Sequence, residues 1–196
     1  MSILIFSKVI QKNKRFKRVF LNKQSELSRS LGVTIDMQDI VSIMISKFKT
    51  HLYEPEDIVV EQYTSTDSLF LIAKGACSVE ITDEKKNKHK LKNLRPGDYF
   101  GEISLIFGCR RTATVLSTKY STLAMLKKES YKEILIEFPD LQQELKKSIY
   151  GYNDRIKRFI INSIQAVEYF DEIGEDATHD IIYNLEGKLY SKNEIL

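Results

Sequence analysis

The sequence of 196 residues contains no tryptophan, three prolines and two cysteines. Cys77 and Cys109 lie in unrelated contexts, so neither a disulfide framework nor a zinc site is indicated, and a reducing compartment is expected. No apolar run approaches the roughly 18 residues that a membrane-spanning helix needs. The net charge of +3 is too small to indicate nucleic-acid binding. We therefore expect neither a membrane span in this sequence nor a nucleic-acid partner.

The amino-terminal segment is basic. Apolar residues Met1–Phe6 precede six cations, Lys8, Lys12, Lys14, Arg15, Lys17 and Arg18. A secretory signal has its charges before the apolar stretch, so this segment is not one. Two interpretations stay open: a basic amphipathic helix that packs on a neighbouring part, which we favour, and a segment that lies on a membrane surface.

Periodicity divides the sequence into helical ends and a β-rich middle. Up to about Thr50, apolar residues recur every three, four or seven positions, with Gly32 as a break and Asp36 as a helix cap. From Leu52, short β-rich runs alternate with turns, which is typical of a sandwich or barrel. After Lys127 the helical period returns, and a long helix is expected over residues 140–160, with Gly151 as a bend or weak point within it. The fold class is therefore α+β: a jelly-roll-like antiparallel β-roll with flanking helices.

The end of the sequence repeats an earlier part. Leu189–Leu196 parallels Leu52–Val59 after 137 residues, and an amphipathic helical segment precedes both copies. We therefore expect a helical linker over residues 1–38 and one domain over 39–160. Residues 161–196 would then form the start of a second, truncated copy of that domain.

The segment Phe100–Val115, FGEISLIFGCRRTATV, carries the chemistry of a ligand site. Gly101 allows close approach of the backbone, and the short helix that follows presents amide hydrogens to an anion. Arg111 supplies a planar cation suited to phosphate, and Glu102 accepts hydrogen bonds from a sugar hydroxyl. The pattern fits a phosphate joined to a sugar. The alternative is that Glu102 and Arg111 pair only with each other.

This segment, with the preceding RPGDY, resembles the phosphate-binding cassette of cyclic-nucleotide-binding domains, and the likeness extends over about residues 40–160. The resemblance implies that backbone amides of Gly101 and Ile103 bind the cyclic phosphate. It also implies that Glu102 binds the ribose 2′-hydroxyl and that Arg111 pairs with the phosphate. The expected ligand is cAMP or cGMP, with no other cofactor and no metal.

The resemblance extends to further residues. Ser104 and Ala113 occupy small-residue positions of the cassette, and Thr112 would bind the phosphate and a syn guanine. Cys109 and Arg110 fall in its variable part and receive no role. The last helix would close over the base as a lid, with Ile156 as the main contact and Arg155 and Tyr152 next to it.

The wider role follows from the same resemblance. The sequences around the cassette and the lid are most similar to those of cyclic-nucleotide-gated and hyperpolarisation-activated cation channels. Arg111-Thr112-Ala113 differs from the Arg-Ala-Ala that is usual in regulatory subunits of cAMP-dependent kinase. We expect a sensor at the cytoplasmic face of a membrane, joined to a pore and able to form a homo-oligomer. The alternatives are a tandem array in a kinase or scaffold, and a degenerate domain that binds no nucleotide.

Catalysis is not indicated. The three histidines, His51, His89 and His179, are isolated, with no nucleophile motif and no metal-ligand spacing around them. We therefore expect the protein not to be an enzyme.

One turn departs from the family pattern. Tyr63 and Thr64 occupy positions where the family has Gly-Asp. Because tyrosine adopts a positive φ only at a cost, we expect this turn to have a different local conformation. We also expect it to lie away from the cassette and to affect stability more than binding.

Overall fold

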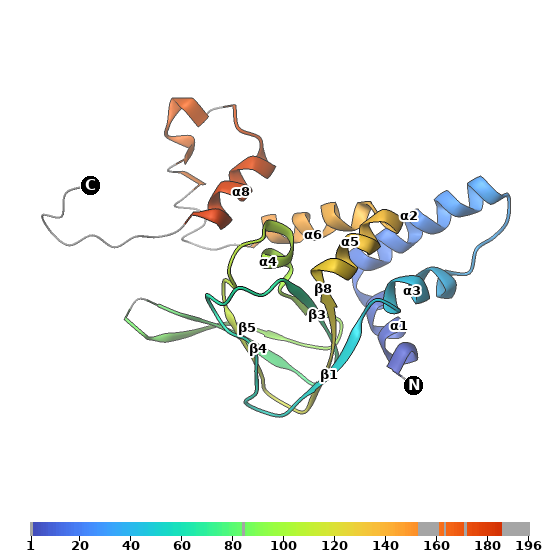
Figure 1. The fold of residues 1–196 in the computed structure, drawn as a ribbon, viewed down its shortest axis with the longest axis horizontal. Helices are drawn as coiled ribbons and strands as arrows, with labels where there is room; N and C mark the ends of the chain where they lie inside the picture. Colours follow the sequence, from blue (N-terminus) through green and yellow to red (C-terminus); the bar gives the residue numbers. More distant parts are fainter. Residues whose placement is uncertain (1, 84, 153–160, 163, 171, 186–196) are drawn as a thin grey trace, which may run out of the picture. The chain divides into compact units, whose positions relative to one another are not determined.

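The computed structural model describes residues 2–83, 85–152, 161–162, 164–170 and 172–185 (Figure 1). Contacts within the chain divide it into two units, Met1–Gly151 and Tyr152–Leu196. The domain boundaries expected from the sequence, after residues 38 and 160, stay predictions.

The first unit contains two four-stranded antiparallel sheets, as the sequence predicted. One sheet has the order β1-β8-β3-β6 and the other β2-β7-β4-β5. The strands are β1 (Lys49–Tyr53), β2 (Ile58–Val60), β3 (Ser68–Lys74), β4 (Cys77–Thr82), β5 (Lys88–Leu94), β6 (Tyr99–Phe100), β7 (Thr114–Ser117) and β8 (Ser121–Lys127). Together with the helices at both ends, they make the fold α+β.

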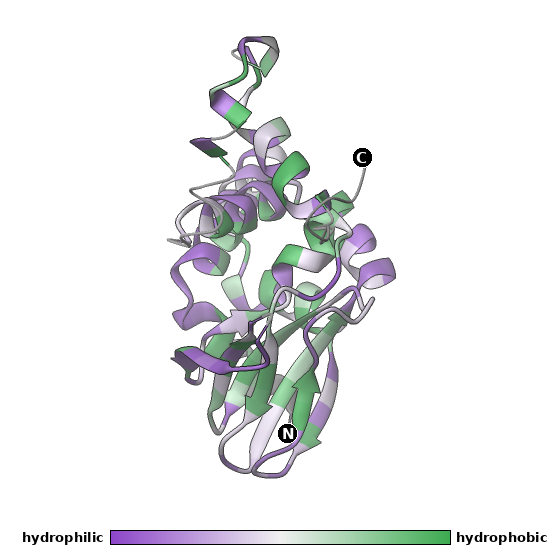
Figure 2. Ribbon diagram, turned by 90° about the vertical axis from the view of Figure 1, so that its left-hand side faces the viewer, coloured by the Kyte–Doolittle hydropathy of each residue, from purple (hydrophilic) through white to green (hydrophobic). Residues whose placement is uncertain are grey.

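Strand β3 lies between two hydrophobic clusters. Phe70 and Ile72 face the cluster enclosed by the two sheets, whereas Leu69 and Leu71 face the cluster formed with the helices. Successive strand residues point to opposite faces, so burial on both faces requires a continuous apolar run. Figure 2 shows hydrophobic residues along the strands and mixed hydropathy along the helices. The apolar sequence of β3 thus places it at the centre of the unit.

Helices from both ends of this unit cover the first sheet. They are α1 (Ser2–Lys12), α2 (Lys14–Leu31), α3 (Met37–Ile45), α5 (Lys128–Glu137) and α6 (Asp140–Tyr150), and the short α4 (Glu102–Phe107) follows β6. The two helix signals predicted near the amino terminus are confirmed. Gly32 ends α2 with φ 67°, and the Asp36 side chain accepts a hydrogen bond from the Gln38 amide at the start of α3. The basic helix α2 packs against the rest of the first unit through its buried residues Phe16, Val19 and Phe20.

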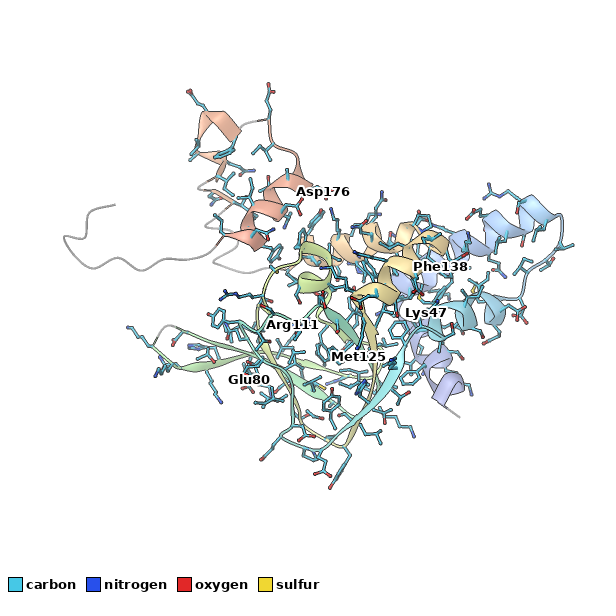
Figure 3. All side chains as sticks on the ribbon, in the orientation of Figure 1. Lys47, Glu80, Arg111, Met125, Phe138 and Asp176 are labelled. Atoms are coloured by element: carbon cyan, nitrogen blue, oxygen red, sulfur yellow. The ribbon has the colours of Figure 1, made fainter. Side chains whose placement is uncertain are left out.

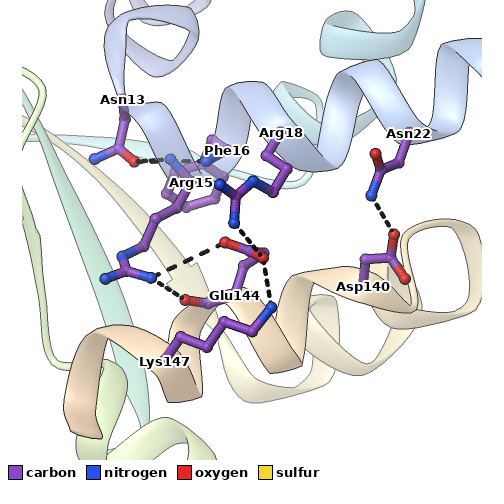
Figure 4. A network of polar contacts seen from close by, with 8 residues as sticks. All are labelled: Asn13, Arg15, Phe16, Arg18, Asn22, Asp140, Glu144 and Lys147. Atoms are coloured by element: carbon purple, nitrogen blue, oxygen red, sulfur yellow. Dashed lines mark hydrogen bonds and ion pairs between the residues drawn. The ribbon is translucent and has the colours of Figure 1, made fainter. Parts of the chain in front are cut away.

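A buried carboxylate joins α2 to α6 (Figure 4). The side chain of Glu144 is only 6% exposed, and its Oε1 lies 3.3 Å from Arg18 and 3.0 Å from Lys147. Arg15 donates to the Glu144 backbone carbonyl at 3.1 Å, and Asn22 donates to Asp140 at 2.8 Å. Such a carboxylate costs free energy to bury unless cations compensate it. The interaction therefore links two helices more than 100 residues apart in the sequence.

The helix expected to run from Asp140 to about Ile160 is shorter than predicted. Helix α6 ends at Tyr150, and its cap Gly151 and the next residue Tyr152 are not helical. Glycine inside a helix costs about 1 kcal/mol relative to alanine, which favours an end at this position. Gly151, which the sequence marks as a bend or weak point of the expected helix, is thus where α6 ends, and residues 153–160 lie outside the described residues.

The second unit contains a short 3₁₀ helix, Glu168–Phe170, and α8 (Glu175–Asn184). Thr178 and Ile182 are buried in α8. Val41 and Ile45 are two buried residues of α3, and Thr178 and Ile182 lie 137 residues after them. This is the interval of the sequence repeat. Leu189–Leu196, the other part of that repeat, lies outside the described residues.

Candidate nucleotide-binding site

The site is formed where β6 leads into α4. Gly101 is the residue before the helix and has φ 83°, a conformation that favours glycine. A Cβ atom there would lie 2.5 Å from Nη1 of Arg111 and 2.5 Å from the Ser68 carbonyl oxygen. Helix α4 has no side-chain hydrogen bond at its N-cap. The amides of its first turn have no acceptor within the helix and are suited to an anion.

Arg111 lies before β7 and points at this helix start (labelled in Figure 3). Its side chain makes four hydrogen bonds to neighbouring parts of the same unit. Nε donates to Thr66 Oγ1 at 2.7 Å, and Nη2 donates to the Ser68 carbonyl at 2.8 Å. Nη1 donates to Ser104 Oγ at 2.8 Å and to the Gly101 carbonyl at 3.0 Å. Arg111 is only 3% exposed, so the guanidinium is held in one orientation.

All four of these acceptors are uncharged oxygens. The expected alternative, in which Arg111 and Glu102 only pair with each other, is therefore not what the side-chain geometry shows. Burial lowers the pKa of Arg111, while the nearby charges of Glu102 and Asp67 raise it, and the net shift is downward. Asp67 itself pairs with Lys128 at 3.4 Å. A buried cation held by neutral acceptors is best compensated by an anion from outside.

Glu102 supplies the second polar group of the site. It is the first residue of α4 and is 3% exposed. A carboxylate accepts hydrogen bonds only, so it suits hydroxyl groups and repels phosphate. A buried cation next to a buried carboxylate therefore fits a ligand that carries an anion and a hydroxyl side by side.

The turn that departs from the family pattern is part of this site. Tyr63 adopts a positive φ of 69°, so the expectation that tyrosine would force another conformation was wrong. The Tyr63 amide donates to the Arg111 carbonyl at 2.8 Å, and the Arg111 amide donates to the Thr64 carbonyl at 2.9 Å. Two backbone hydrogen bonds compensate the cost of the left-handed conformation. The expectation that the turn lies away from the cassette was also wrong.

The remaining predicted residues have different environments. Ser104 is buried on α4, Ile103 and Ala113 are half-buried, and Thr112 is exposed. Of the predicted lid residues, Tyr152 is half-buried in the second unit, and Arg155 and Ile156 lie outside the described residues. The sequence analysis missed Thr66 and Ser68, which contact Arg111 from the segment before β3 and from its first residue.

Comparison with known families identifies the class of the first unit. Residues 50–138 match the family described as "Cyclic nucleotide-binding domain". This range contains the whole cassette, both sheets except Lys49, and helices α4 and α5. Over these residues, which are less than half of the chain, the first unit is therefore similar to cyclic nucleotide-binding domains.

Curated relatives include cation channels. The chain is 30% identical over 118 residues to the mouse (Mus musculus) potassium/sodium hyperpolarization-activated cyclic nucleotide-gated channel 2, covering 60% of this chain and 13% of the channel. Channel 4 of the rabbit (Oryctolagus cuniculus) is also 30% identical over 118 residues, which are 10% of that channel. This chain thus spans only a small part of the channels that it matches.

Solved structures show the same fold. The catabolite activator protein of Thermus thermophilus matches with a TM-score of 0.55 and 25% identity, over 56% of this chain and 52% of that one. The regulatory domain of Toxoplasma gondii PKA, crystallised with cAMP, matches with a TM-score of 0.53 and 21% identity, over 72% of this chain and 51% of that one.

The described residues contain neither a membrane-spanning helix nor a cluster of metal-binding side chains. None of the described helices is long and apolar enough to cross a bilayer. Within the same residues, no three His, Cys, Asp or Glu side chains gather as a metal site would require.

Proposed function

We propose that this chain binds cAMP or cGMP at the cassette Phe100–Val115 and acts as a nucleotide-controlled regulatory domain, not as an enzyme. One observation carries the proposal: Arg111 is 3% exposed, and its hydrogen-bond acceptors in the described part of the chain are all uncharged. A permanent buried charge of this kind is stabilised by a bound anion. The match of residues 50–138 to the cyclic nucleotide-binding domain family supports the same ligand class.

The proposed ligand contacts follow from the environment of each group. Arg111 and the amides of Gly101 and Ile103 bind the cyclic phosphate, and the buried Glu102 accepts the ribose 2′-hydroxyl. Thr112 is exposed next to Arg111 and contacts the phosphate and a syn guanine. Ser104 and Ala113 leave room for the ligand, because both are small.

We further propose that ligand binding moves the segment after α6. The helix end at Gly151 gives that segment a point where its direction changes without breaking helical hydrogen bonds. In this proposal Tyr152, Arg155 and Ile156 contact the base. The displacement regulates whatever part of the protein follows or precedes the domain.

The regulated part is proposed to be a cation pore at the cytoplasmic face of a membrane. The 30% identity to hyperpolarization-activated channels over 118 residues supports this context. The alternative is a tandem array in a kinase regulatory subunit or scaffold. It is supported by the sequence repeat and by the matching burial of Ile45 and Ile182 at the repeat interval.

Calorimetric titration of the purified chain with cAMP and with cGMP tests the proposal. Arg111→Lys keeps the charge but loses the planar fork, and the five N–H donors of the guanidinium are replaced by the three of an ammonium. We expect it to weaken binding at least roughly tenfold, the effect of one lost charge-assisted hydrogen bond. Arg110→Lys is the matched control, since Arg110 is exposed in the variable part of the cassette and has no assigned role.

Two results would contradict the proposal. One is a wild-type chain that binds neither nucleotide. The other is an Arg111→Lys variant that binds as tightly as the wild type while its thermal unfolding is unchanged.

A further inference from the structure

We infer that Thr66 is a positioning residue for the nucleotide site, because it fixes the orientation of the Arg111 guanidinium before ligand arrives. The inference rests on the proposed function and adds a residue that lies 34 positions or more before the cassette. Thr66 Oγ1 accepts the Arg111 Nε hydrogen at 2.7 Å, the shortest of the four hydrogen bonds of this guanidinium.

The Nε contact has a different effect from the other three. A guanidinium is planar, so the direction of its two Nη groups is set by rotation about the Cδ–Nε bond. An acceptor on Nε fixes that rotation, while acceptors on Nη1 and Nη2 compete with a phosphate for the same hydrogens. Arg111 has five N–H groups, and four of them have acceptors among the described residues. Thr66 therefore binds the one donor that is not on a terminal nitrogen and leaves the terminal donors to exchange with the ligand.

The segment that carries Thr66 is bound to Arg111 by its backbone as well. Tyr63 donates to the Arg111 carbonyl and Thr64 accepts from the Arg111 amide. Thr64 is in turn fixed to Glu61, whose carbonyl accepts from its hydroxyl at 2.6 Å. The turn is therefore bound to Arg111 by two backbone hydrogen bonds, and its left-handed Tyr63 lies three residues before Thr66.

Thr66 is exposed, which separates a positioning role from a packing role. An exposed hydroxyl is satisfied by water and contributes little to folding. The buried Nε–H has no such substitute, because loss of its acceptor leaves a charged donor unpaired. Loss of this hydrogen bond therefore costs more free energy at the Arg111 guanidinium than at the Thr66 hydroxyl.

The test compares Thr66→Val, which keeps the shape but removes the acceptor, with Thr66→Ser, which keeps it. We expect the valine variant to bind cAMP about tenfold more weakly, equivalent to about 1.4 kcal/mol, and the serine variant to bind nearly as the wild type does. Thr50→Val is the matched control, because Thr50 is also exposed and lies on the outer strand β1 of the first sheet. Its affinity should equal that of the wild type.

A second readout distinguishes orientation from general destabilisation. The two diastereomers of adenosine 3′,5′-cyclic phosphorothioate differ only in which exocyclic oxygen is replaced by sulfur, so an oriented fork binds them unequally. Thr66→Val should bring the ratio of their dissociation constants closer to one. An unchanged ratio, a serine variant as weak as the valine variant, or a valine variant as tight as the wild type would each overturn the inference. A wild-type chain that fails to bind cAMP and cGMP would instead refute the proposed function.

Discussion

Replacing Gly101 by alanine should remove most of the nucleotide affinity, whereas the same replacement at Gly108 should not. Both glycines flank α4 and both have positive φ, 83° and 70°. Alanine in this conformation costs about 1–2 kcal/mol at either position. Each variant should therefore lose about 2–8 °C of thermal stability in the absence of ligand.

The two positions differ in what a methyl group would meet. Nothing lies within 4 Å of a Cβ at Gly108, whereas at Gly101 the Cβ would lie 2.5 Å from Arg111 Nη1 and from the Ser68 carbonyl. The carbonyl belongs to the central strand β3, so both the start of α4 and the guanidinium must move away from their present positions. Losing one charge-assisted hydrogen bond to the phosphate costs about 1.5–3 kcal/mol, which is about 10- to 150-fold in affinity.

Calorimetry with cAMP and thermal unfolding without ligand, applied to wild type and both variants, measure the two effects separately. We expect both variants to lose stability, Gly101→Ala more than Gly108→Ala because of its two close contacts, and a loss of affinity only in Gly101→Ala. If both variants weakened binding equally, the contact with Arg111 would not be the cause, and the reasoning would be refuted.

Three further predictions concern charge and base selection. Glu144→Gln should lower the free energy of unfolding by about 1–3 kcal/mol at pH 7, because it removes the charge bound by Arg18 and Lys147. Burial raises the pKa of Glu144, but the hydrogen bonds from Lys147 and Arg18 outweigh it, and the pKa lies below its ordinary value. The stabilisation is thus present above the ordinary pKa of a glutamate and is lost as the pH falls through the lower folded-state pKa. Urea unfolding should show the difference from wild type narrowing toward acid, and a pH-independent difference would contradict this. Thr112→Ala should weaken the binding of cGMP about 2- to 10-fold more than the binding of cAMP in calorimetry, which is the effect of one neutral hydrogen bond. Equal losses of affinity for the two nucleotides would mean that the hydroxyl contacts the phosphate alone. Adenosine 5′-monophosphate, with about −1.5 to −2 charges, should displace a fluorescent cAMP analogue at least tenfold less effectively than cAMP does, because Arg111 matches one charge; equal displacement would rule out this charge matching.

Much of the fold was predictable because its signals are local. The cap at Asp36 and the break at Gly32 depend on neighbouring residues, and the runs of apolar residues give the strands directly. The order of Gly101, Glu102 and Arg111 in the cassette is likewise a local pattern, and the structure brings these residues together.

The features that were missed depend on contacts between distant parts of the sequence. Thr66 and Arg111 are 45 residues apart, and Arg18 and Glu144 are 126 apart. Nothing in the sequence around Thr66 indicates that it holds an arginine. The conformation of Tyr63 was predicted wrongly, because its cost is compensated by hydrogen bonds to Arg111 that only the folded chain supplies.

The hydrophobic cluster that β3 forms with the helices extends beyond the residues that match the family. The family match ends at residues 50 and 138, yet this cluster also includes Phe16 and Phe20 before that range and Leu145 after it. Phe20 packs against Phe138 with ring centroids 6.1 Å apart. The segment that matches the family is therefore shorter than the segment that buries this cluster. A fusion protein that contained residues 50–138 alone would expose one face of β3 to water. Such a fusion would need helices from its partner protein to cover that face.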